Sequence, residues 1–192
     1  MSFFDNLKRQ VAQSAGQTVQ KLGAETGNVT YKVELPQLPV NLAQLQTMPE
    51  GALKKPEHTA ALTIAALCIY PIYRDAALEM LNYLQGPRGL TPYDKQFLED
   101  RFRDKDYVPR SYFAGATPQN NYEPTEPYTV TVFENPYSRG QDGYLTLHVR
   151  SGGADSPRQI KLRNKPSTGQ WFLWEQFLLS DIRKPVSADP WA

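Results

Sequence analysis

The stretch GYLTLHVRSGGADSPRQIKLRNKPSTGQWFLWEQF, residues 143–177, decides the fold. Its first run alternates leucine or valine with polar side chains from Leu145 to Val149. The run at 158–164 alternates in the same way, and turn residues separate the runs. A period of two is typical of a strand with one face in the core and the other partly in water. The sequence therefore predicts antiparallel strands here and, by the same pattern, over residues 128–134.

Before residue 106 the hydrophobic period is helical. Three helices are predicted, over residues 57–70, 74–86 and 91–105. The first, EHTAALTIAALCIY, is apolar on nearly every side, which places it centrally, and Pro71 ends it. Thr91 before Pro92 marks the start of the third. Helices followed by strands predict an α+β domain, with N-terminal helices packed on one face of a curved antiparallel sheet of about four or five strands.

Three segments are expected along the chain. They are an amphipathic N-terminal helix within residues 1–26, a proline-spaced connector over 27–56 and the α+β domain over 57–192. Asn41 is expected to start a short helix in the connector. The domain comprises helices over 57–105, the sheet over 107–180 and an ordered C-terminal tail. We expect Trp191 to hold that tail against the body.

Composition narrows the function classes. The 192 residues include 21 basic and 20 acidic side chains, a net charge of +1, so no nucleic-acid partner is expected. The single cysteine, Cys68, lies in the apolar helix and is expected to be a buried, inert thiol. His58 and His148 lie on different elements, so we expect no metal and no cofactor. Without a signal-peptide pattern or an apolar run of about 20 residues, we expect a cytoplasmic protein.

The glycine-rich loop SGGADSPR, residues 151–158, allows two interpretations. It is a hairpin turn, as paired glycines, Asp155 and a proline indicate. Alternatively, Asp155 and Arg158 form a polar notch that holds an anion. The phosphate-binding and nucleophile-elbow patterns are both missing from the loop, because a strand follows it and no serine lies between glycines at the required spacing. The hairpin interpretation is favoured.

The polar face of the sheet is the second candidate site. Depending on register, it gathers His148, Arg150, Lys161, Arg163 and Glu175, with Tyr144 and either Trp171 or Trp174. If part of this face is left uncovered, it forms a ligand pocket with aromatic walls. General acid–base chemistry would need His148 next to a carboxylate such as Glu175. The alternative is a solvated surface of cross-strand charge pairs.

The N-terminal helix is the third candidate. Phe3 and Phe4 lie at its tip, and Phe4, Leu7 and Val11 repeat at helical spacing within residues 3–22. Such a helix packs on its own domain, pairs with a helix of a protein partner, or lies at a membrane surface. The last use would place the protein peripherally at the inner face of the membrane.

Four strings resemble an uncharacterised bacterial family classed only as a domain of unknown function. They are YVPRSYFAGATPQNNYEP, RSGGADSPRQIKLR, WFLWEQFLLSDIRKP and the closing DPWA. The resemblance covers residues 57–192 and leaves the N-terminal helix outside. It implies a cytoplasmic bacterial protein and supplies no activity and no catalytic residues.

Three functions are therefore open. The favoured one is a non-enzymatic binding or protein-interaction module, because no catalytic constellation is recognisable in the sequence. The others are a small-molecule pocket or enzyme on the polar sheet face, and a membrane-surface-associated protein that attaches through its N-terminal helix. The order of elements is similar to cystatin-like and nuclear-transport-factor-like folds, which support binding and catalysis alike.

Overall fold

The structure is a computed structural model that describes residues 21–22 and 29–191. Its α-helices are α2 (Leu42–Thr47), α3 (Pro56–Ile69), α4 (Arg74–Gln85) and α5 (Pro92–Phe102). Its strands are β1 (Lys21–Leu22), β2 (Thr30–Leu35), β3 (Tyr128–Phe133), β4 (Tyr144–Val149), β5 (Arg158–Lys165) and β6 (Gln170–Gln176). Lys21 and Leu22 were expected at the end of the N-terminal helix and instead form a strand. The rest of that predicted helix lies outside the described residues.

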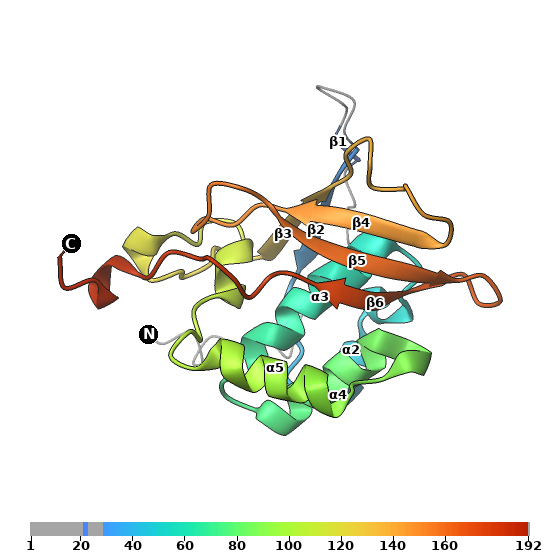
Figure 1. The fold of residues 1–192 in the computed structure, drawn as a ribbon, viewed down its shortest axis with the longest axis horizontal. Helices are drawn as coiled ribbons and strands as arrows, with labels where there is room; N and C mark the ends of the chain where they lie inside the picture. Colours follow the sequence, from blue (N-terminus) through green and yellow to red (C-terminus); the bar gives the residue numbers. More distant parts are fainter. Residues whose placement is uncertain (1–20, 23–28, 192) are drawn as a thin grey trace.

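The strands form one antiparallel sheet whose spatial order follows the chain, from β1 to β6 (Figure 1). The four α-helices of the described residues lie on one side of this sheet, so the predicted α+β fold is confirmed. Five of the strands have six or more residues, in agreement with the predicted four or five strands. Strand β1, with only two residues, is a sixth.

Strand β2 lies in the segment that we expected to be a connector. It pairs with β3 along its whole length, from Thr30 opposite Phe133 to Leu35 opposite Tyr128. Val33 and Leu35 are buried in the core. Residues 30–56 are therefore part of the folded domain, and Asn41 starts α2 there as predicted, since its side chain accepts from the Gln44 amide at 2.9 Å.

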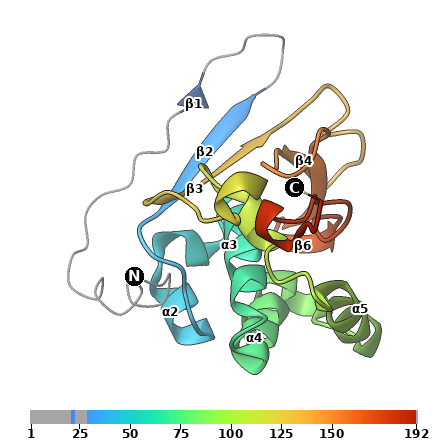
Figure 2. The same ribbon diagram turned by 90° about the vertical axis from the view of Figure 1, so that its left-hand side faces the viewer.

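Helix α3 is the centre of the molecule. Every residue from Glu57 to Ile69 is buried, as expected for a helix that is apolar on nearly all sides. It contacts β2, β3, β4, β5 and β6 on one side and α4 on the other (Figure 2). Cys68 is buried as predicted, and this burial raises the pKa of its thiol to about 12, which disfavours the reactive thiolate.

Helix α5 is peripheral by comparison. Thr91 and Asp94 form a capping box at its start, with the Asp94 amide donating to the Thr91 hydroxyl at 3.1 Å. Leu98 is the one buried residue of this helix, while Phe97 and Phe102 are partly buried against the core. Few side chains therefore hold α5 in place.

The tail after β6 returns beside residues 109–122, at the left of Figure 1. The Tyr112 hydroxyl donates to the Leu178 carbonyl, and the Tyr122 hydroxyl donates to the Arg183 carbonyl at 2.6 Å. Buried tyrosines thus hold the tail at Leu178 and Arg183, upstream of Trp191, where we expected the attachment. The prediction that Trp191 packs on the body is wrong, because 93% of its surface is exposed.

Candidate functional site

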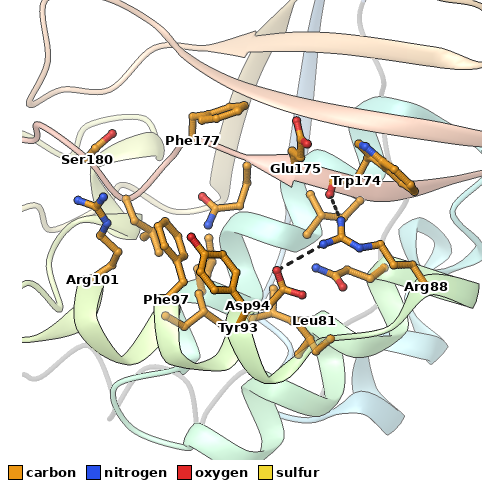
Figure 3. Close-up of a pocket in the computed structure, with 17 residues that line it drawn as sticks. Leu81, Arg88, Tyr93, Asp94, Phe97, Arg101, Trp174, Glu175, Phe177 and Ser180 are labelled. Atoms are coloured by element: carbon orange, nitrogen blue, oxygen red, sulfur yellow. Dashed lines mark hydrogen bonds and ion pairs between the residues drawn. The ribbon is translucent and has the colours of Figure 1, made fainter.

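A groove of about 520 Å³ lies between α5 and β6 (Figure 3). We call it the α5–β6 groove. Leucine side chains from several elements line it and are buried, namely Leu67 of α3, Leu81 of α4, Leu98 of α5, Leu173 of β6 and Leu179 beyond β6. Pockets of about 300–1,000 Å³ with apolar walls and a few polar groups are typical of small-molecule sites.

Aromatic side chains form the rim of the groove. Tyr93 and Phe97 rise from α5 toward β6, and Phe177 lies on the opposite wall (Figure 3). Tyr93 is 77% exposed and Phe177 is 52% exposed. Clusters of exposed apolar side chains with polar neighbours mark interaction sites more often than plain surface. The rim therefore offers flat apolar faces to a ligand.

A fixed charge pair closes one end of the groove. Arg88 donates to the Trp174 carbonyl, and its guanidinium lies 5.2 Å from the Trp174 ring centroid. The same guanidinium is 3.5 Å from Asp94, whose other oxygen accepts from the Thr91 amide at 2.9 Å. Both charges are thus engaged within the protein. The capping box of α5 positions Asp94, Asp94 positions Arg88, and Arg88 joins the start of α5 to β6.

Gln85 lies near this end and lines the groove. It is the last residue of α4, and only 8% of its surface is exposed. Its carboxamide oxygen is buried and, among the described residues, accepts no hydrogen bond. A buried acceptor without a donor is unfavourable and uncommon, so such a group in the wall of a groove points to a ligand or to a water molecule.

Arg101 lies toward the other end, where Figure 3 also draws Ser180. Its guanidinium is 5.1 Å from the Phe97 ring centroid. Within the part of the chain that the structure describes, it forms no hydrogen bond and no ion pair. A guanidinium stacked on an aromatic ring keeps its donors available for a planar anion. The groove thus combines a leucine floor and an aromatic rim with an acceptor and a cation that have no partner among the described residues.

The residues of the predicted polar sheet face lie on or next to β4, β5 and β6, but they do not converge on one site. Tyr144 is opposite Arg163, and Lys161 is opposite Glu175, with a bulge between β5 and β6. The Arg163 guanidinium lies 5.4 Å from the Tyr144 ring centroid and 4.9 Å from that of Trp174. Of the two tryptophans considered, Trp174 is therefore the one on this face. Glu175 and Trp174 also border the α5–β6 groove, and no other member of the predicted set does.

His148 is not beside Glu175. It is opposite Gln159 and stacks on Phe133, with ring centroids 5.4 Å apart. The Asn135 carboxamide nitrogen lies 3.3 Å from its Nε2. The β3–β4 loop covers the imidazole, and this burial lowers its pKa. The predicted acid–base pair is thus not formed, because His148 is a covered structural residue while Glu175 is exposed two strands away.

Arg150 and the glycine-rich loop have structural contacts as well. The Arg150 guanidinium lies 5.5 Å from the Phe133 ring centroid. Asp155 pairs with Arg183 at 2.8 Å and not with Arg158. Arg158 donates to three carbonyl oxygens, those of Ser156, Ser180 and Asp181. The loop therefore connects β4 and β5 as a hairpin, and its arginine is engaged by backbone instead of forming a notch with Asp155.

The predicted contact residues Phe3, Phe4, Leu7 and Val11 lie outside the described residues, so their role stays a prediction. Apart from Trp174 and Glu175, the residues of the α5–β6 groove were not predicted as a site. The aromatic side chains of residues 92–102 were a usable indication, since a peripheral helix with Tyr93, Phe97 and Phe102 has more apolar surface than it buries. Gln85 gave no indication, because a glutamine at a helix end is ordinarily solvated.

The fold and groove define a class: an α+β domain that packs helices on an antiparallel meander and leaves a mixed apolar and polar groove at the sheet edge. The chain belongs to the family described as a domain of unknown function (DUF6935), which it matches over residues 37–186, more than three quarters of its length. The match begins before the predicted domain start at residue 57, in agreement with the folded connector. No curated protein and no solved structure matches the chain significantly.

No helix among the described residues has the length and apolar character needed to cross a membrane. Within residues 21–22 and 29–191, no three histidine, cysteine, aspartate or glutamate side chains converge as metal ligands would.

Proposed function

We propose that the domain is a binding module and that the α5–β6 groove is its binding surface. The supporting observation is the coincidence, in one groove of about 520 Å³, of exposed aromatic side chains with a buried acceptor that has no partner within the described chain. Packing alone would not require Tyr93 and Phe177 to remain exposed beside a leucine floor. The polar sheet face is a weaker candidate, because His148 is covered and the Arg163 guanidinium already contacts the rings of Tyr144 and Trp174.

The proposal is tested with 1-anilinonaphthalene-8-sulfonate, an aromatic anion whose fluorescence rises in apolar surroundings. We expect saturable binding with one site per chain. Tyr93→Ala and Phe177→Ser should each weaken it about fivefold, since an aromatic contact contributes about 1 kcal/mol. Both side chains are more than half exposed, so neither change should lower the unfolding midpoint appreciably.

Tyr137→Ala is the matched control. Tyr137 is also a highly exposed aromatic residue, at 86%, but it lies in the β3–β4 loop and not in the groove. Its removal should leave the affinity within twofold of the unchanged protein. Absence of saturable binding, or equal losses in the control and the groove variants, would refute the proposal.

A further inference from the structure

The two polar ends of the α5–β6 groove are far enough apart to specify a ligand's length. Asp94 and Arg101 are seven residues apart on α5, which corresponds to about 10 Å at a rise of 1.5 Å per residue. Gln85 belongs to the Asp94 end, because α4 ends there and Arg88 follows three residues later. The groove therefore presents an acceptor near one end and a cation near the other.

The acceptor end requires a donor from outside the described chain. Arg88 is the nearest charged donor in sequence, but it is engaged by the Trp174 carbonyl and Asp94. The Gln85 oxygen is covered by neighbouring atoms. Rotation about the terminal torsion of a glutamine is soft, so we expect the carboxamide to turn its oxygen toward a ligand donor in the groove. An N–H or O–H group of a ligand satisfies it.

The cation end requires an anion. Of the charged side chains that line the groove, Arg88 and Asp94 neutralise each other, and Glu175 lies across from Lys161 on the sheet. Arg101 is left without an ion pair in the described residues, and its ring contact with Phe97 holds the guanidinium at the groove. The planar fork of a guanidinium matches a carboxylate with two parallel hydrogen bonds.

The middle of the groove requires a flat apolar body. The rings of Tyr93 and Phe97 rise from α5 beside the leucines of the floor, and Phe177 lines the groove from the β6 side. Aromatic side chains favour stacked or edge contacts with another ring. A planar ring system fills such a slot with less loss of conformational freedom than a flexible chain.

We infer that the α5–β6 groove binds a small elongated organic acid with a flat apolar ring, a ring N–H or O–H that donates to Gln85, and a carboxylate at Arg101. This inference rests on the proposed function of the groove and specifies its ligand class. Indole-3-butyrate is the probe, because its ring N–H and its carboxylate lie at opposite ends of the molecule, where the N–H donates to Gln85 and the carboxylate accepts from Arg101.

Calorimetric titration of the full chain tests the carboxylate contact. Arg101→Gln should weaken indole-3-butyrate about tenfold and change the affinity for its uncharged amide, indole-3-butyramide, less than twofold. Arg103→Gln is the matched control, since Arg103 is an exposed arginine two residues along that pairs with Asp100 and does not line the groove. It should leave both affinities unchanged. Equal effects of Arg101→Gln on acid and amide would overturn the inference.

The hydrogen bond to Gln85 is tested by removing the acceptor from the protein and, separately, the N–H donor from the ligand. Gln85→Met should weaken indole-3-butyrate about fivefold and leave 1-naphthalenebutyrate, which has no N–H, within twofold. The same substitution should raise the urea midpoint, because it removes a buried acceptor without a partner. Equal losses for both ligands would overturn the donor assignment, and a lower midpoint would show that the oxygen is satisfied internally.

The outcomes separate the inference from the proposed function. One outcome is that the naphthalene sulfonate binds in the groove while Arg101→Gln and Gln85→Met change the affinities for all the tested acids and the amide equally. In that case the proposed function stands and the inferred ligand class is wrong. If neither kind of ligand binds, both fail. If Phe177→Ser instead abolishes a concentration-dependent dimer, the groove is an interface between two copies of the chain and the inference is overturned.

Discussion

Gly152 and Gly153 lie against atoms of a different segment, the irregular stretch between α5 and β3. A Cβ atom on Gly152 would lie 1.9 Å from the Ala116 carbonyl oxygen, and one on Gly153 would lie 2.1 Å from the Tyr122 hydroxyl. The Gly152 amide donates to the Ser111 carbonyl at 2.8 Å, and the Arg183 amide donates to the Gly153 carbonyl at 2.9 Å. The glycines are therefore needed for close backbone packing and not for holding an anion.

Gly152→Ala should destabilise the protein by about 2 kcal/mol, because a backbone carbonyl cannot move aside as a flexible side chain can. The urea midpoint measured by tryptophan fluorescence checks this. Gly140→Ala is the matched control, since a Cβ there is 3.4 Å from its nearest neighbour, the Tyr137 carbonyl oxygen. Equal midpoints for the two variants would contradict the expectation.

At the scale of elements, sequence patterns predicted the helices and strands that depend on local spacing. They did not predict the groove, which residues from distant parts of the chain form together. Helix α3 was predictable because its apolar residues are consecutive, and Gly86 ends α4 in a backbone conformation, φ 60°, that favours glycine. Strand β2 was missed because its six residues precede closely spaced prolines, which pointed to a connector. The groove was missed because leucines from α3, α4, α5 and β6 meet only after folding, and no spacing in the chain records that meeting.

Because α5 buries few side chains, we expect it to open locally more often than the other helices. Helix α3 has thirteen buried residues and α4 has five, whereas α5 has one. Local opening follows buried contacts, so the amides of α5 should exchange with solvent deuterium at least tenfold faster than those of α3, with α4 between them. Hydrogen exchange followed by mass spectrometry measures this order. Exchange of α5 as slow as that of α3 would show that unrecognised contacts hold it.

At the scale of the whole molecule, the free energy of unfolding depends on pH, because some titratable side chains are buried in their neutral form. Burial, aided by the charge of Lys55, lowers the pKa of His58 to about 4, well below its ordinary value near 6.5. Above pH 6.5 the imidazole is neutral in both the folded and the unfolded chain. Between pH 6.5 and 4 the unfolded chain binds a proton that the folded chain excludes, so the free energy of unfolding falls as the pH falls.

We expect His58 to lower the free energy of unfolding by about 3 kcal/mol between pH 7 and pH 4. Burial also raises the pKa of the neighbouring Glu57, and that shift acts in the opposite direction. Urea titrations at several pH values on the unchanged protein and on His58→Gln separate the two effects. The variant should lose less stability on acidification, and parallel pH profiles would rule out a buried neutral imidazole at this position.

The order of the strands has a consequence for how the chain is synthesised. Strand β2 emerges early, but its partner β3 follows far later, since Leu35 is paired with Tyr128, 93 residues downstream. Helix α3 is made between them, and its apolar surface stays without the sheet that covers it until β6 has left the ribosome. The apolar surface of α3 is therefore exposed in the nascent chain until the later strands are made, and such exposed surface favours aggregation.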